Sequence, residues 1–287
     1  MRYLLVSLLL LVSSLSAQIK EPKPGMNLFS KEQDIQLGIE TAAEIEKQYE
    51  VIKDPGLQRY IDNVGQKLTR SKRASDFPYT FTVVSDDSIN AFALPGGPMF
   101  IHTGLIKAAE NEAQLAGVMS HEISHVALRH GTNQASKANL IKLPAVLGGQ
   151  IAGNGILGAI AQTGIGLGAN SVLLSFSRSA ETQADTNGTL ILSDAGYNPV
   201  EMARFFEKLE ADGAKQSRVA EFFASHPNPG NRVKSVETLV AQLPAKRYTN
   251  GDQAAFTQAQ KIVQKLPPPK PCAKPEPKPQ QPQQQAR

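Results

Sequence analysis

Two histidines and a glutamate in one short run are the first candidates for chemistry in this chain of 287 residues. His121, Glu122 and His125 form a His-Glu-x-x-His pattern within a segment of helical periodicity. Helix positions four apart project from adjacent turns of one face, so both imidazoles can bind the same Zn²⁺. Glu122 lies too near the helix axis to ligate easily, but it can reach a water molecule at the metal. A chance match on a helix is the alternative.

A catalytic zinc ion needs a third protein ligand and one position left open for water. Glu181 and Asp185 are four residues apart in a second predicted helix, so their carboxylates point the same way. Burying both destabilises the fold unless cations neutralise them. We expect Glu181 to ligate the metal and Asp185 to accept the spare N–H of a ligand imidazole. The alternative is a solvated helix start, where acidic residues are common.

Two other histidines are expected to have structural roles. His130 is nine residues after His121, about half a turn away on a helix that we expect to stop at Gly131. It is therefore predicted to cap the helix end and not to join the metal. His102 lies on a predicted strand and is expected to be a sheet residue.

The elements that must position these residues are mostly helices. Spacing of apolar residues predicts helices over 33–49, 57–68, 111–130, 181–195, 199–209 and 229–243. Asn111 is the expected cap of the metal-binding helix, with Gln114 as its capping-box partner. β-Forming residues and a Pro-Gly-Gly turn predict strands over 79–84, 91–93 and 99–102. The sequence thus predicts an α+β fold, mainly helical, with a small antiparallel sheet whose edge strand precedes the active-site helix.

The two ends of the chain differ in composition from the segment between them. Residues 1–17 combine Arg2, a short apolar stretch and small residues, which is typical of a secretory signal peptide, with an uncleaved membrane anchor as the alternative. Residues 266–287 hold eight of the 19 prolines among Lys and Gln, so we expect a disordered tail. Cys272, the only cysteine, lies in this tail and is expected to be a free thiol. The single predicted domain is 18–265.

The distribution of charged and apolar residues along the chain indicates which partners the protein can bind. The formal net charge of +4 comes from the tail and Arg2, which leaves 18–265 neutral and without an electrostatic reason to bind nucleic acid. Residues 144–168 carry no charge and eight glycines, which favours a flap over a cleft, with membrane-surface contact as the alternative.

Further motifs accompany the metal-binding pattern. They are Asn27-Leu28-Phe29-Ser30, Ile89-Asn90-Ala91-Phe92-Ala93-Leu94-Pro95-Gly96-Gly97, Gly196-Tyr197-Asn198-Pro199 and Ser225-His226-Pro227. In this combination, over most of 18–265, the chain resembles the gluzincin metallopeptidases of the HtpX and CAAX-prenyl-protease kind, most closely an exported BepA/LoiP-like branch. Such relatives can carry tetratricopeptide repeats after the protease domain. We expect that module to be absent here, because about 20 residues separate Ala245 from the tail.

The resemblance implies a zincin-like fold and one Zn²⁺ per chain, held by His121, His125 and Glu181, with Glu122 as general base. His226, in the His-Pro motif, is a candidate oxyanion donor; a fourth metal ligand and a structural loop histidine are its alternatives. Asn90 and Ala91 resemble the gluzincin edge strand that pairs with an extended peptide, with a plain hairpin strand as the alternative.

The function expected from these features is zinc-dependent endopeptidase activity on unfolded or misassembled proteins of the cell envelope, after export to the periplasm. Backbone pairing at an edge strand tolerates many sequences, which suits such substrates. The alternative is a zinc-containing periplasmic chaperone or assembly factor with little routine proteolysis. An intact Glu122 favours the enzyme, because a binding protein has no need of a general base.

Overall fold

The computed structural model describes residues 19–137, 175–213, 217–228 and 230–269. The predicted signal peptide (1–17), the uncharged segment 144–168 and Cys272 lie outside the described residues. The predictions about them therefore stay predictions.

Helices make up most of the described chain, as predicted. Their bounds are α1 Lys31–Gln48, α2 Pro55–Thr69, α3 Thr103–Ala108, α4 Glu112–Ala127, α8 Arg178–Asp194, α9 Val200–Asp212, α10 Ser217–Ser225, α11 Arg232–Val240 and α12 Gln253–Gln264, with a short 3₁₀ helix at Lys72–Ala74. The sequence analysis did not predict α3, α10 or α12. Among the described helices, none has both the length and the apolar character needed to cross a bilayer.

Local sequence explains how the first helices begin. The Ser30 hydroxyl accepts the Gln33 backbone N–H while the Gln33 side chain accepts the Ser30 N–H, a complete capping box at α1. Asp54 accepts two backbone N–H groups at the start of α2, where Pro55 occupies the first turn. These caps satisfy N–H groups that a helix start leaves without intrahelical partners.

The sheet has three strands among the described residues, β1 Thr80–Val84, β2 Ala91–Ala93 and β3 Pro98–His102, in the order β1-β3-β2. β2 and β3 are antiparallel, but β1 runs parallel to β3, so the expectation of a purely antiparallel sheet was wrong in this detail. The reason is that the chain reverses twice between β1 and β3, and β3, not β2, lies next to β1. β2 is an edge strand, as expected, and it precedes α4.

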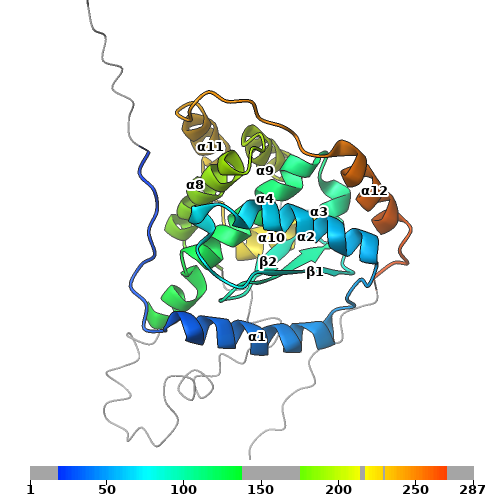
Figure 1. Ribbon diagram of the computed structural model, residues 1–287, viewed down its shortest axis with the longest axis horizontal. Helices are drawn as coiled ribbons and strands as arrows, with labels where there is room; N and C mark the ends of the chain where they lie inside the picture. Colours follow the sequence, from blue (N-terminus) through cyan, green and yellow to red (C-terminus); the bar gives the residue numbers. More distant parts are fainter. Residues whose placement is uncertain (1–18, 138–174, 214–216, 229, 270–287) are drawn as a thin grey trace, which may run out of the picture.

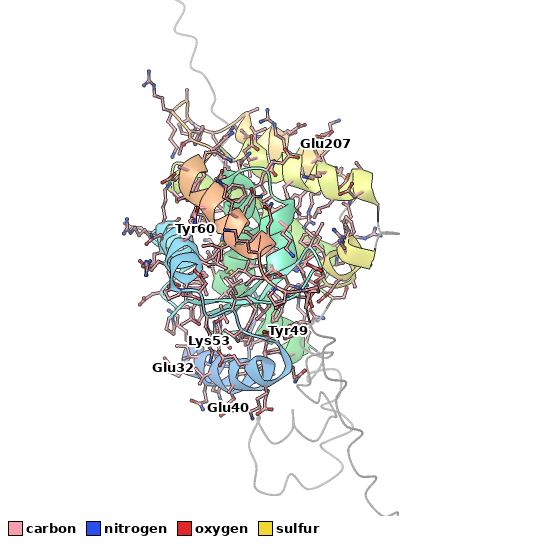
Figure 2. The ribbon with its side chains drawn as sticks, turned by 90° about the vertical axis from the view of Figure 1, so that its right-hand side faces the viewer. Glu32, Glu40, Tyr49, Lys53, Tyr60 and Glu207 are labelled. Atoms are coloured by element: carbon pink, nitrogen blue, oxygen red, sulfur yellow. The ribbon has the colours of Figure 1, made fainter. Side chains whose placement is uncertain are left out.

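The sheet separates two apolar layers. On one side it packs on α1, through residues that include Ile45, Phe92 and Phe100. On the other side lies the larger core shared by α2, α4 and the later helices. Figure 1 shows this order, with α1 below the strands and α2 and α4 above them. In Figure 2, Glu32 and Glu40 lie on the side of α1 turned away from the sheet. The predicted fold class, a mainly helical α+β domain, is confirmed.

Candidate metal centre

Helices α4 and α8 form the frame of the candidate site. Asn111 caps α4 by accepting the Gln114 N–H, as predicted, but the Gln114 side chain accepts from Glu110 instead of closing a capping box. Gly188 of α8 lies against α4, where an added Cβ would come 3.1 Å from the His121 backbone nitrogen. A hydrogen bond of 3.1 Å from Asn187 to Ser124 ties the helices together at the same level. This close approach brings the α8 carboxylates to the α4 histidines.

The α4 helix ends earlier than the sequence suggested. Its last helical residue is Ala127, and Arg129 adopts a left-handed conformation with φ of 56° before residues 130–137 resume a helix. Arg129 donates to Asp34 at 2.6 Å and to the carbonyl oxygen of Phe29 at 2.7 Å, which offsets the backbone strain. The helix stop is therefore Arg129, and the prediction of Gly131 was wrong.

The structure brings the three predicted metal ligands together. Nε2 of His121 and Nε2 of His125 lie 3.0 Å apart, and each lies 3.4 Å from an oxygen of Glu181. All three side chains are buried. Together with His226 they offer four ligand atoms within 4.8 Å of one another.

These distances fit a zinc ion. Ligand atoms that are about 2.0–2.2 Å from a tetrahedral Zn²⁺ lie about 3.3–3.6 Å from one another, close to the separations found here. Two imidazoles and a carboxylate are also the donor set of many catalytic zinc sites. Without an ion, three ring nitrogens and a carboxylate would crowd a space that no apolar group fills.

The second α8 carboxylate lies behind the first ligand. Asp185 Oδ1 is 2.9 Å from His121 Nδ1, on the side of the ring opposite to Nε2. In this place Asp185 can orient the imidazole and increase its basicity. The distance agrees with the predicted contact, but neither atom meets the angular criteria of a hydrogen bond as the side chains stand, so the role of Asp185 stays a prediction.

Sequence reasoning missed the cation that both carboxylates need. Arg232 of α11 is only 1% exposed, and it donates through its Nη2 to Glu181 at 2.7 Å and through its Nε to Asp185 at 2.9 Å. Its guanidinium also lies over the Phe206 ring at 4.2 Å. The requirement for a neutralising cation was visible in the sequence, but the residue that meets it was not.

The surroundings perturb the protonation of the site. Burial opposes charge on His121, yet Asp185 and Glu181 outweigh it and raise the pKa of His121 to about 9. Burial lowers the pKa of His125 well below its ordinary value, which favours the neutral ring that a metal requires. Burial would raise the pKa of Glu181, but His226, His121 and His125 hold it below the ordinary range.

Glu122 is buried beside the ligands but points to a different neighbour. Its Oε1 lies 3.3 Å from Nε2 of His226. Burial raises the pKa of Glu122, against the opposing effects of His226 and His121. A carboxylate with a raised pKa is suited to accept a proton and return it near neutral pH.

His226 follows the end of α10 and faces both groups. Its Nδ1 lies 3.4 Å from His121 Nε2 and 3.3 Å from Glu181 Oε1, while its Nε2 faces Glu122. The ring therefore lies where either an additional metal ligand or a donor to a reacting oxygen is needed. The two roles stay open as predictions.

His130 and Phe176 support His125 in a way that the sequence did not reveal. His130 Nδ1 lies 3.0 Å from His125 Nδ1, and its Nε2 lies 3.3 Å from Gln183 Oε1. Phe176, just before α8, stacks on His125 with ring centroids 3.9 Å apart. His130 is not in the ligand group, as expected, but it does not simply cap a helix end. The turn at Arg129 brings it back towards α4.

The edge strand β2 runs past Glu122. The Asn90 carbonyl oxygen accepts the His102 N–H, and the Leu94 N–H donates to the Pro98 carbonyl oxygen, which sets the register and leaves the backbone groups of Ala91 and Ala93 unpaired with β3. The Ala93 N–H interacts with the Glu122 carboxylate. Asn90 differs from Ala91, because its backbone N–H and C=O already bond to Ser88 and His102. Of the two predicted substrate-binding residues, only Ala91 has backbone groups directed away from β3, and it is 0% exposed in this structure.

Comparison with known proteins agrees with this geometry. Residues 55–240 match the family described as Peptidase family M48. The chain belongs to this family. The resemblance drawn from the sequence motifs and the predicted enzyme class, a metallopeptidase, are thereby confirmed.

Three similar curated proteins have names that identify them as proteases or endopeptidases. The chain is 32% identical over 218 residues to the "Beta-barrel assembly-enhancing protease" of Escherichia coli (strain K12), covering 74% of this chain and 44% of that protein. It is 35% identical over 202 residues to the "Putative beta-barrel assembly-enhancing protease" of Vibrio cholerae, with 68% and 41% covered. "Mitochondrial metalloendopeptidase OMA1" of Schizosaccharomyces pombe is 27% identical over 191 residues, with 67% and 55% covered. The match thus spans less than half of the two bacterial relatives.

Proposed function

We propose that the chain is a zinc-dependent metalloendopeptidase that cleaves unfolded or misassembled proteins in the cell envelope, where it acts in protein quality control. The observation that carries the proposal is the meeting of His121, His125 and Glu181 around one point, with the Glu122 carboxylate beside it. A binding protein could use the ligands, but it would gain nothing from a buried Glu122 beside them.

In this proposal the ligands of a catalytic Zn²⁺ are His121, His125 and Glu181, which the donor set and the short distances support. When bound, zinc supplies a Lewis acid that polarises a peptide carbonyl and makes water more acidic. Glu122 would accept a proton from the attacking water and deliver it to the leaving amine. Asp185 orients His121, and Arg232 balances the charge of both α8 carboxylates. The site is buried, so these electrostatic interactions are weakly screened.

Substrate would lie along β2 as an added strand. The outward N–H and C=O of Ala91 can pair with an extended peptide, next to Glu122. Such pairing requires an unfolded segment of the substrate, and it recognises the peptide backbone more than the side chains. This mode of binding supports unfolded or misassembled proteins as the substrate class, in line with the names of the bacterial relatives. Asn90 would assist only by fixing the start of the strand.

The cellular place is part of the proposal. The signal-like residues 1–17 support export, and the periplasm is the compartment that we propose. Contact with a membrane surface, suggested by the uncharged segment 144–168, is an additional possibility that concerns residues outside the described structure.

The decisive experiment compares the wild type with Glu122→Gln on casein and on a denatured client. We expect fragments only from the wild type, with activity reduced at least about 100-fold in the variant, because general acid–base catalysis is removed. Metal content should be equal in both, since Glu122 is not a ligand. If neither protein produces fragments while both bind the client, the chaperone alternative is correct.

A further inference from the structure

A second group of metal-ligating side chains lies outside the catalytic centre. Asp86 follows β1, His102 ends β3, and Glu221 lies on α10, and each offers a ligand atom within 4.8 Å of the others. His102 is 0% exposed, while Asp86 and Glu221 are partly exposed. The three residues come from separate elements, so only the tertiary fold brings them together.

Two buried polar atoms at this place have no hydrogen-bond partner among the described residues. They are Nε2 of His102 and Oδ1 of Asn90, and both residues are 0% exposed. The Asn90 amide points at the group, because its Nδ2 donates to Glu221 Oε1 at 3.2 Å. The other ring nitrogen of His102, Nδ1, lies 2.6 Å from the Ser88 hydroxyl and 3.6 Å from Asp86 Oδ1. Buried polar atoms without partners are rare, and an ion that the structure does not contain is one explanation of them.

The carboxylates of the group also lack a lysine or arginine partner. In the part of the chain that the structure describes, neither Asp86 nor Glu221 forms an ion pair with a lysine or an arginine. The nearby Lys107 pairs with Asp87, at 2.7 Å. The catalytic centre differs, because Arg232 neutralises its two carboxylates. The basic partner of Asp86 is thus the ring of His102, at 3.6 Å, and Glu221 has no ion-pair partner among the described residues.

The loop that carries Asp86 is already held in place. The Asp86 backbone N–H bonds to the Thr103 hydroxyl at 3.1 Å, and its carbonyl oxygen accepts that hydroxyl at 2.8 Å. Gly104 lies so close that an added Cβ would be 2.4 Å from the Asp87 carbonyl oxygen. A fixed loop can present its carboxylate without a large ordering cost, which favours ligand binding.

We propose that Asp86, His102 and Glu221, with the amide oxygen of Asn90, form a second binding site for a divalent transition-metal ion such as Zn²⁺ or Mn²⁺. Imidazole suits zinc, and carboxylate and amide oxygens suit manganese, so this mixed set favours these ions over Ca²⁺ or Mg²⁺. For all four atoms to bind one ion, the Asn90 amide would have to turn over, so that Oδ1 replaces the Nδ2 that now donates to Glu221.

The site joins the sheet to α10. Asp86 lies in the loop after β1, and His102 is the last residue of β3. Glu221 lies one turn before the end of α10, which leads directly to His226. The backbone N–H of Ile89 already donates to the Arg218 carbonyl oxygen at 2.7 Å, so the two parts are in contact. A bound ion would hold α10, and with it the start of the His226 loop, on the sheet edge.

The test is the metal stoichiometry of the full chain, purified without a histidine tag, stripped with chelator, equilibrated with Zn²⁺ and freed of excess ion. Elemental analysis should give two zinc ions per wild-type chain. It should give one for Glu221→Gln and one for His102→Gln. Asp87→Asn is the matched control, since it removes a charge from the same loop without touching the group, and it should keep two.

The design separates this proposal from the catalytic one. Glu181→Ala should lose the catalytic ion and keep the second, and only the double variant with Glu221→Gln should bind none. If circular dichroism shows that His102→Gln does not fold, the zinc content of Glu221→Gln decides, because Glu221 is partly exposed. Equal zinc content in the wild type and Glu221→Gln would overturn the proposal; His102 would then be an imidazolium paired with its carboxylates.

Discussion

The catalytic centre and the second group, Asp86, His102 and Glu221, each combine histidine with two nearby carboxylates, yet the protein treats them differently. In the centre, Arg232 donates to both carboxylates, and the ligand histidines contact orienting partners. In the second group the carboxylates are partly exposed and have no arginine. The comparison indicates that fully buried carboxylates require a cation from the protein itself, whereas partly exposed carboxylates can bind an ion from solution.

The largest expected effect comes from removing the third ligand of the centre. Glu181→Ala should abolish zinc binding at the catalytic site and reduce proteolysis to background, because two imidazoles alone hold zinc weakly. Elemental analysis and casein cleavage measure both. Glu207→Ala is the control, since Glu207 is exposed on the outer side of α9 (Figure 2). If Glu181→Ala kept the full zinc content at the catalytic site, Glu181 would not be a ligand, and the two groups could not be compared as two metal sites.

Removing the compensating cation should have the next largest effect. Arg232→Met leaves Glu181 and Asp185 buried without a guanidinium, so we expect the metal-free protein to lose about 3–5 kcal/mol of unfolding free energy. Urea titration measures the loss. Lys47→Met is the control, because Lys47 and its partner Glu44 are 68% and 54% exposed, and it should cost less than about 1 kcal/mol. Equal losses in the two variants would show that Arg232 is not the compensating charge.

Asp185→Asn tests the orientation of a ligand. The ligands stay in place, but His121 loses its carboxylate partner, so zinc affinity should fall about 10–100-fold. Competition with a fluorescent chelator measures this change. Asp194→Asn makes the same substitution at the far end of α8, where Asp194 bonds to Ser71 and Arg73, and should leave affinity unchanged. A similar affinity loss in both variants would assign the effect to α8 in general.

The smallest effect is expected beside the second group. Lys107→Met removes a cation that pairs at the surface with Asp87, the residue after Asp86. We expect a change in unfolding free energy below about 1 kcal/mol and no change in zinc stoichiometry. A loss comparable to that of Arg232→Met would mean that Lys107 already compensates the group, and it would weaken the contrast.

Much of the fold could be predicted because the signals are local. Apolar spacing and caps locate α1, α2, α4, α8 and α9 to within a few residues, since a helix depends on neighbours three and four positions away. The parallel pairing of β1 with β3 was missed, because the pairing of strands depends on the route of the chain between them. The stop of α4 was misplaced because Arg129 holds its left-handed conformation through bonds to α1, which no local pattern encodes.

The sequence by itself determined the chemistry that is possible: His121 and His125 share a helix face because they are four residues apart, and Glu122 accompanies them by adjacency. The tertiary structure decided what surrounds that chemistry. Arg232, His130 and Phe176 reach the site from distant or redirected segments, and Asp86, His102 and Glu221 meet only through packing of α10 on the sheet. The physical reason is that helical spacing fixes geometry over one turn, whereas contacts between elements follow from burial of the whole core.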